Sequence, residues 1–269
     1  MKNKGTIIAV MNNKGGVGKT TVCLNLGAAL ANRGHNVAVL DLDSQCNLTN
    51  MLLDPKTITG TMYELLTNRM DNPDLLGHPS NVRNMTCYPN AEETAALEVD
   101  LLANPGVPEA YSIIRQKLRD HLKNHHQFTF IDCPPNMGLF AVSALYAADF
   151  AIVPVLAGSF FSLEGLLKAG QLIGNISEKA NPDLRFLRLL VNAVDMRTHM
   201  GKVAMAQLQS RFGEGQVFKT SIQSAASFQQ AEYHRRTILR HAPNSAPSKA
   251  YRELADELMG ILELETTES

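Results

Sequence analysis

Short apolar runs alternate with longer stretches of helical periodicity along most of the chain. The first run, Thr6–Met11, is rich in β-branched residues and is followed by a glycine-rich turn. A helical pattern then covers Thr20–Asn32 and ends at Gly34, and a second apolar run occupies Asn36–Leu40. Two short strands joined by a helix form a βαβ unit, whose strands are parallel. The start of the chain therefore predicts a parallel sheet covered by a helix.

The same alternation continues toward the end of the chain. Strands that alternate with helices predict an α/β fold with one doubly wound, mostly parallel sheet flanked by helices. We expect residues 1–269 to form a single domain of this kind. The further predicted strands are Phe128–Ile131, Phe150–Val155 and Leu187–Val191, with a short one starting at Val217–Phe218. The further predicted helices are Glu109–Asn124, Leu139–Ala147, Leu163–Glu178, Lys202–Phe212 and Ser248–Leu262.

The segment Asp71–Pro108 is less regular and holds several prolines and asparagines. Two short runs within it, Met85–Tyr88 and Val99–Leu102, favour strands, and the rest favours loops. Apolar residues continue through the segment, so it is expected to pack on the domain. We therefore predict an irregular elaboration of the domain at about 71–108, and not a linker.

Composition is that of a globular protein. The chain has 269 residues, of which 45% are hydrophobic and 19% charged, so it can bury a large core. The four cysteines form no C-x-x-C pair and match no zinc signature, which favours reduced thiols in a cytoplasmic protein. No signal peptide is indicated at Met1–Gly5, and no apolar run reaches the ~20 residues that span a bilayer. The cysteines are Cys23, Cys46, Cys87 and Cys133.

Charge is unevenly distributed along the second half of the chain. The formal net charge of −1 argues against a general affinity for polyanions. From Asp183 to His241, however, nine Lys or Arg stand against four Asp or Glu, a local net of +5. From Tyr251 to Ser269, one Arg stands against six Asp or Glu, a local net of −5. Any contact with nucleic acid must therefore come from a local patch.

A glycine-rich segment follows the first strand and opens the first helix. Its end, Gly18-Lys19-Thr20, fits the phosphate-binding pattern G-x-x-x-x-G-K-[ST], whereas Asn13 stands in place of the first glycine. Asn tolerates the left-handed conformation better than most residues, so we expect the loop to form. Glycines let backbone N–H groups face phosphate oxygens, and the helix N-terminus adds positive charge. Lys19 is expected at the β- and γ-phosphates and Thr20 on Mg²⁺; the alternative is a glycine-rich turn without a ligand.

Acidic residues follow two of the predicted strands. Asp41 and Asp43 come after the second strand, and Asp132 comes directly after Phe128–Ile131. Ligand chemistry in an open α/β sheet gathers at the carboxyl ends of the strands. These carboxylates are therefore candidates for metal binding and for general-base chemistry. The alternative for the first pair is an acidic loop that caps a helix near Asn47.

With these three segments the chain resembles the ParA/MinD group of deviant Walker ATPases. The loop of that group reads K-G-G-x-G-K-[ST], and Lys14 supplies its first lysine here. The group's motif D-x-D-x-Q-x-N matches from Asp41 to Asn47, and its motif D-x-P-P matches at Asp132-Cys133-Pro134-Pro135. The resemblance implies a P-loop ATPase with ATP and Mg²⁺ as cofactors, slow intrinsic turnover and an ATP-bound homodimer.

The resemblance also implies roles for individual residues. Lys14 would reach across the dimer to the partner's ATP, unless it is only a solvated loop lysine. Asp43 would position or activate the attacking water, and Asp41 would support the metal site. Thr20, Asp43 and Asp132 would hold Mg²⁺, and Lys14, Lys19 and Asp43 would be the catalytic residues. The nucleotide-binding residues would be Asn13, Lys14, Gly15, Gly16, Val17, Gly18, Lys19, Thr20, Thr21, Asp41, Asp132 and Pro134.

Later segments resemble the short ParA proteins called Soj, which lack a helix-turn-helix domain. These are V-P-V at Val153–Val155, L-E-G at Leu163–Gly165, and the closing segment from Thr237 to Tyr251. The resemblance implies ATP dimers that bind nonspecific DNA, a nucleoid-associated state, and hydrolysis stimulated by a ParB-like partner. The family's I-P-R-N-V-R stretch is absent at Ile222–Ser227, which removes two basic positions. The candidate DNA contacts are Arg197, Lys202, Lys219, Arg235, Arg236 and Arg240.

Three other functions remain open at this point. The basic region is compatible with a solvated face that has no nucleic-acid role. A membrane-cycling ATPase of the MinD type would need a basic amphipathic C-terminal helix, which the acidic tail after Arg252 opposes. A metallochaperone or reductase ATPase would need paired cysteines at a dimer axis, and none are evident. We therefore expect no membrane partner.

Overall fold

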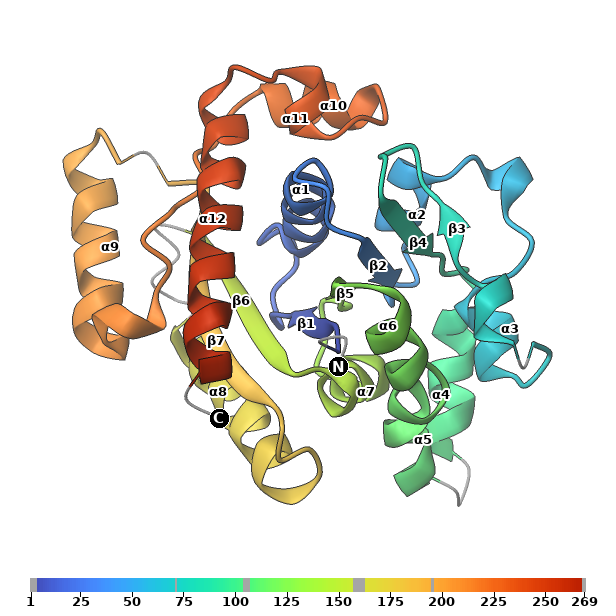
Figure 1. Ribbon diagram of the computed structural model, residues 1–269. Coiled ribbons are helices and arrows are strands. Elements are labelled where there is room, and N and C mark those ends of the chain that lie inside the picture. The colour runs from blue at the N-terminus through green and yellow to red at the C-terminus, as the bar shows by residue number, and fades with distance from the viewer. Residues whose placement is uncertain (1–3, 71, 104–106, 157–162, 195, 268–269) are drawn as a thin grey trace.

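The computed structural model describes residues 4–70, 72–103, 107–156, 163–194 and 196–267. At its centre is a seven-stranded sheet with the strand order β3-β4-β2-β5-β1-β6-β7 (Figure 1). All neighbouring pairs in this sheet are parallel except β3 with β4. The strands are β1 (Thr6–Val10), β2 (Val37–Asp41), β3 (His78–Pro79), β4 (Met85–Tyr88), β5 (Phe128–Asp132), β6 (Phe150–Leu156) and β7 (Arg185–Asn192).

The register of the central strands brings their carboxyl ends together. Asp132 at the end of β5 is paired with Val10 of β1 on one side and with Asp41 of β2 on the other. The loop that leaves β1 and the two acidic strand ends therefore meet at one edge of the sheet. This is where an open parallel sheet places its ligand site.

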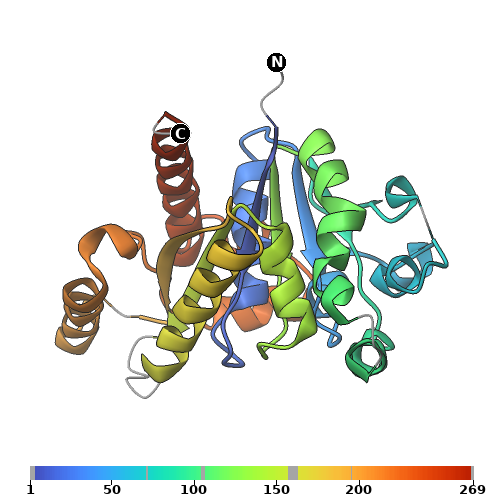
Figure 2. The same ribbon diagram turned by 90° about the horizontal axis from the view of Figure 1, so that it is seen from below.

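Helices cover both faces of the sheet. One apolar core joins the sheet to α1, α2 and α12, and a second core on the other face joins it to α5, α6, α7 and α8. Figure 2 shows α8, α7 and the α5–α6 unit side by side over the sheet. The helices are α1 (Lys19–Ala31), α2 (Asn47–Leu52), α3 (Met62–Leu66), α4 (Thr94–Ala103), α5 (Val107–Ile114), α6 (Asp120–His125), α7 (Leu139–Ala147), α8 (Leu163–Lys179), α9 (His199–Phe212), α10 (Ser227–Tyr233), α11 (Ile238–His241) and α12 (Ala246–Thr267).

The alternating pattern of the sequence predicts this α/β sheet correctly. Most predicted strands and helices agree with the structure to within a few residues, and Leu139–Ala147 agrees at both ends. The predicted helix Glu109–Asn124 corresponds to α5 and α6, which a π-helical turn at Arg115–Arg119 joins. The predicted strand start at Val217–Phe218 is reduced to a single bridge between Leu189 and Val217.

One predicted strand is wrong. Val99–Leu102 lies inside the helix α4, whose sequence TAALEVDLLA is dominated by strong helix formers. Leu97 and Leu101, four positions apart, pack together against the core, as the spacing of a helix allows. A single β-branched Val99, 67% exposed, does not outweigh this pattern.

The irregular segment also contributes to the main sheet. The predicted strand Met85–Tyr88 is present as β4 and pairs in parallel with β2 along four residues. It is mostly buried, with Cys87 and Tyr88 almost fully enclosed. The two-residue strand β3 pairs with β4 in the antiparallel sense and forms the edge of the sheet.

Candidate nucleotide site

The loop between β1 and α1 is curled by two glycines and held from both sides. Gly16 and Gly18 have φ angles of 74° and 90°, a region that disfavours residues with a side chain. On one side, Asn12 Nδ2 donates to the carbonyl of Pro154 in β6 at 2.7 Å. On the other, Asn192 Nδ2 at the end of β7 donates to the carbonyl of Val17 at 2.8 Å. The neighbouring strands thus fix a loop whose shape the glycines permit.

Asn13 occupies the place of the first glycine without adopting a left-handed backbone. Among the residues that the structure describes, the non-glycine residues with positive φ are Cys46, Asn68, Asn84, Ala193 and Arg235. The turn does not use the tolerance of Asn for this conformation, because its positive φ angles lie at Gly16 and Gly18. A Cβ added at Gly165 would come within 2.7 Å of Asn13 Oδ1, so Asn13 lies against a glycine of α8.

Lys19 starts α1 and is 7% exposed. Its ammonium donates to the Lys14 carbonyl at 3.3 Å, which closes the loop on itself. The backbone N–H of Lys14 donates to Asn12 Oδ1 at 3.1 Å, while its side chain is exposed. The loop therefore directs one lysine inward and presents the other at the surface.

Asp41 is fully buried and holds the segment that follows β2. Its carboxylate accepts hydrogen bonds from Thr49 N at 2.9 Å, Thr49 Oγ1 at 2.8 Å and Asp43 N at 3.1 Å. Burial raises the pKa of Asp41 to about 6, against the lowering effect of the Thr49 bonds. Asp41 thereby orients Asp43, which is half-buried and accepts from the N–H of Gln45 at 3.0 Å.

Asp132 is a buried carboxylate without a hydrogen-bonding partner of normal geometry. Only 1% of the residue is exposed, and in the described part of the chain neither oxygen accepts a hydrogen bond. Burial, and then the negative charge of Asp41, raise the pKa of Asp132, while Thr20 and Lys19 lie close enough to oppose the rise. A buried carboxylate needs a partner. Two orphaned carboxylate oxygens beside a threonine hydroxyl fit a hydrated magnesium ion.

A cleft of about 440 Å³ opens in front of the phosphate loop. It brings together the predicted Gly15, Gly16, Gly18, Lys19, Thr20, Thr21 and Asp43. Val17 lines a second hollow of about 420 Å³ on the other side of the loop, and Pro134 lies with Asp43 in a third. The first cleft is also lined by Leu24, Asn25, Gln45, Asn47, Met51, Pro135, Phe228, Ala231, Glu232, Arg236 and Ile238.

Sequence reasoning missed several residues of this site. Asn12 and Asn192 position the loop through side-chain bonds across the sheet, and Phe228 lies between the two hollows. Asn12 could have been identified from the sequence, because it is a polar residue that follows a buried strand. Asn192 is likewise a polar residue at the end of a strand, β7, whereas no local sequence pattern distinguishes Phe228.

The candidate DNA contacts are all exposed but lie on different elements. Lys202 is on α9, at one edge of the molecule, and Arg240 is on α11, above α1 (Figure 1). Arg236 lines the nucleotide cleft. Arg235 is bound to backbone carbonyls, with Nε donating to Asn50 at 2.6 Å and a terminal nitrogen to Leu53 at 3.4 Å. The remaining candidates, Arg197 and Lys219, lie in the segments before α9 and before α10.

Fold and site together define a P-loop ATPase. The model of the AAA domain family matches residues 5–186. The chain is 32% identical to the sporulation initiation inhibitor protein Soj of Bacillus subtilis over 256 residues, covering 94% of this chain and 98% of that protein. It is 35% identical to the chromosome-partitioning ATPase Soj of Thermus thermophilus, covering 94% of each chain. The chain therefore belongs to the AAA domain family, and within it to the ParA/MinD-type partition ATPases.

Solved structures share the fold of this chain. The chain superposes with a TM-score of 0.81 on cobyrinic acid a,c-diamide synthase from Mycobacterium smegmatis with bound ATP analogue and magnesium, at 29% identity and covering 95% of this chain and 94% of that one. The cell division ATPase MinD of Pyrococcus furiosus has the same fold, with a TM-score of 0.76 at 23% identity, covering 96% of this chain and 99% of that one. Within the described ranges, no helix is both long and apolar enough to cross a bilayer.

Proposed function

We propose that the chain is an ATP-dependent dimerising switch that binds nonspecific DNA as an ATP dimer and partitions or positions a cargo. The observation that carries the proposal is the combination of an intact phosphate loop, an outward-facing Lys14 and an Asp43 that lines the same cleft. Its similarity to the chromosome-partitioning ATPase Soj of Thermus thermophilus supports the same interpretation.

The cleft in front of the loop takes ATP with Mg²⁺. Backbone N–H groups of the loop and the N-terminus of α1 bind the phosphates, and Lys19 neutralises the β- and γ-phosphates. Thr20 and Asp132 hold the metal with Asp43, and when bound the ion supplies positive charge to the phosphate oxygens. The orphaned oxygens of Asp132 are the feature of this chain that best fits that ion.

Hydrolysis depends on Asp43 and on a second copy of the chain. Asp43 positions or activates the water, because its carboxylate is half-buried at the cleft and its loop is fixed by Asp41. Lys14, at the exposed tip of the loop, reaches the ATP of the partner and adds positive charge at the transferring phosphoryl group. Turnover is slow until an activating protein of the ParB type completes the site.

The basic region between Asp183 and His241 provides the contacts to DNA. Its local net charge of +5 and the exposure of its candidate side chains suit phosphate binding, which carries no sequence preference. The acidic region after Tyr251, with a net of −5, opposes an anionic membrane surface. The protein then cycles between the cytoplasm and the nucleoid, where its cargo is moved.

Binding to nonspecific duplex DNA by the Asp43→Ala variant tests this proposal. The variant is measured with ATP, with ADP and without nucleotide, at several salt concentrations. We expect tight binding with ATP alone and a linear loss of log affinity with log salt. Equal binding in all three states would contradict a switch. Pelleting with anionic liposomes in ATP, without any DNA binding, would favour the MinD-type membrane cycle.

A further inference from the structure

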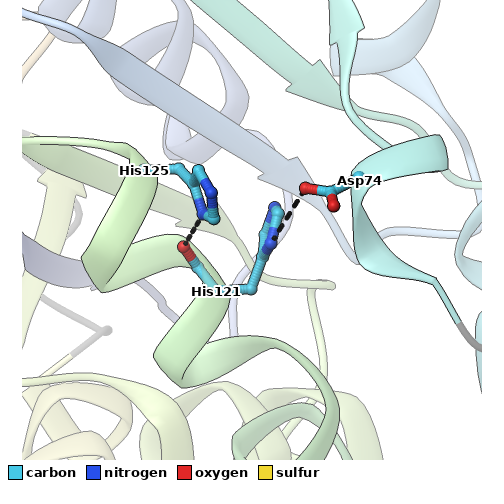
Figure 3. A group of neighbouring side chains, drawn as sticks. All are labelled: Asp74, His121 and His125. Atoms are coloured by element: carbon cyan, nitrogen blue, oxygen red, sulfur yellow. Dashed lines mark hydrogen bonds and ion pairs between the residues drawn. The ribbon is translucent and has the colours of Figure 1, made fainter.

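We propose that Asp74, His121 and His125 form a binding site for one divalent transition-metal ion of the Zn²⁺ class. The three residues each offer one ligand atom, and these atoms all lie within 4.8 Å of one another. Figure 3 shows His121 with its ring directed toward Asp74 and His125 beside it on the same helix. In the described chain, the cluster has no residue in common with the nucleotide cleft.

The backbone brings the three ligands together from two segments. His121 and His125 are four positions apart on α6, so they project from the same side of the helix. Their rings lie 4.3 Å apart between centroids. Asp74 comes from the short 3₁₀ turn Pro73–Leu75, and its Oδ1 is 3.5 Å from His121 Nδ1. A His-x₃-His pair completed by a carboxylate from another segment is a common ligand set for zinc.

Hydrogen bonding selects the tautomer of His125. Its Nδ1 lies 2.9 Å from the backbone carbonyl of His121, which can only accept a hydrogen bond. Nδ1 therefore carries the proton and donates, and Nε2 carries the lone pair. Metal-binding histidines have this arrangement, in which the second nitrogen is held by a carbonyl or carboxylate.

A chain of hydrogen bonds selects the tautomer of His121. Asn36 Nδ2 donates to the His125 carbonyl at 2.7 Å, so Asn36 Oδ1 accepts from His126 Nδ1 at 3.3 Å. His126 Nε2 must then accept from the Tyr88 hydroxyl at 2.9 Å. The Tyr88 oxygen in turn accepts from His121 Nε2 at 2.9 Å. The proton of neutral His121 is thus on Nε2, and its Nδ1 lone pair faces Asp74.

The lone pair of His121 Nδ1 and the Asp74 carboxylate face each other, and a bound cation would be coordinated by both. Two ligands held about 2.0–2.1 Å from a tetrahedral ion are about 3.3 Å apart, close to the separation of His121 Nδ1 and Asp74 Oδ1. His125 and Asp74 are exposed, so their side chains can move to complete the set.

The donor set selects the kind of ion. Two imidazoles and one carboxylate suit Zn²⁺, Co²⁺ or Ni²⁺, whereas Mg²⁺ prefers oxygen ligands. The four cysteines are all buried and do not compete for added metal in the folded chain. Three protein ligands leave one position for water, and the bound ion ties the turn Pro73–Leu75 to α6.

Titration of the full-length chain with ZnCl₂ tests the site. The chain is freed of metal, kept in excess Mg²⁺ without nucleotide, and followed by calorimetry. We expect one Zn²⁺ per chain for the parent and for His199→Ala, an exposed histidine on α9 that serves as the control. His125→Ala and Asp74→Asn should each weaken binding at least about tenfold, because loss of even an outer-shell partner costs about 10–100-fold.

Two further readouts make the result decisive. Co²⁺ should give the visible spectrum of a four-coordinate ion with the parent and lose it with His125→Ala. Zn²⁺ should raise the thermal midpoint of the parent more than that of His125→Ala, because the ion binds only the folded state. Absence of saturable binding to the parent, or equal affinity of parent, His125→Ala and Asp74→Asn, would overturn the proposal.

Discussion

The nucleotide cleft and the candidate DNA contacts are built in opposite ways. The cleft gathers three short segments at the carboxyl ends of β1, β2 and β5, where the register of the sheet fixes Asp41 against Asp132. Its key side chains are buried or half-buried and most are held by hydrogen bonds. The basic residues are exposed and lie on separate helices and loops, and one of them, Arg235, is bound to backbone carbonyls.

The difference shows that the two parts of the proposed function depend on the positions of their residues to different degrees. ATP hydrolysis needs a few groups at fixed positions. The residues that supply them therefore lie at strand ends and form recognisable sequence motifs. Contact with DNA phosphates needs only local positive charge and tolerates changes in position. We therefore expect substitutions in the cleft to have large, specific effects and those on the basic surface to have small, graded ones.

The largest effect is expected for Lys19→Ala. The buried ammonium is the positive charge that the phosphate loop holds inside the cleft, and its loss removes an electrostatic contact to the β- and γ-phosphates. ATP turnover should fall by about a thousandfold or more, toward background. Phosphate release and nucleotide binding measure both losses, and an unchanged rate would refute the phosphate-loop assignment.

A large but more selective effect is expected for Asp43→Ala. ATP binding should persist, because the phosphate loop, Thr20 and Asp132 still hold the nucleotide and its metal, while hydrolysis should fall by about a hundredfold or more. Nucleotide binding and single-turnover hydrolysis separate the two properties. Loss of binding and turnover in equal proportion would show that Asp43 serves the ground state, and not the attacking water.

A graded effect is expected on the basic surface. Arg197→Ala and Arg240→Ala should each weaken DNA binding and reduce the salt slope by about one. Arg235→Ala, whose guanidinium already donates to the carbonyls of Asn50 and Leu53, should change that slope less. Titrations at several salt concentrations compare the three variants. Identical slopes for all variants and the parent would place the interface elsewhere.

The smallest effect is expected for the stability of Arg235→Ala. Loss of its two backbone contacts should lower the free energy of unfolding by about 1 kcal/mol. Arg240→Ala, which removes an exposed side chain, serves as the matched control. Chemical denaturation of both variants measures the difference, and equal stability would mean that the Arg235 contacts contribute nothing in solution.

The sequence predicted the features that depend on neighbouring residues in the chain, and it missed those that depend on contacts between distant segments. A glycine-rich loop, a lysine at a helix start and acidic strand ends are local features, and they lie where expected. Val99–Leu102 was wrongly assigned because a short apolar run does not distinguish a strand from a helix. The roles of Asn192 and Asp74 depend on contacts between segments far apart in the chain, which no local pattern reveals.

The most direct test of the account is the ATP-dependent mass of two variants by light scattering. Asp43→Ala holds ATP without hydrolysing it, so it should be a dimer with ATP and a monomer with ADP. Adding Lys14→Ala to the same chain should leave ATP binding intact and shift the dimer toward monomer, because Lys14 then no longer reaches the partner's ATP. A full dimer in the double variant, or a monomer of Asp43→Ala with ATP, would contradict a switch that closes around two shared nucleotides.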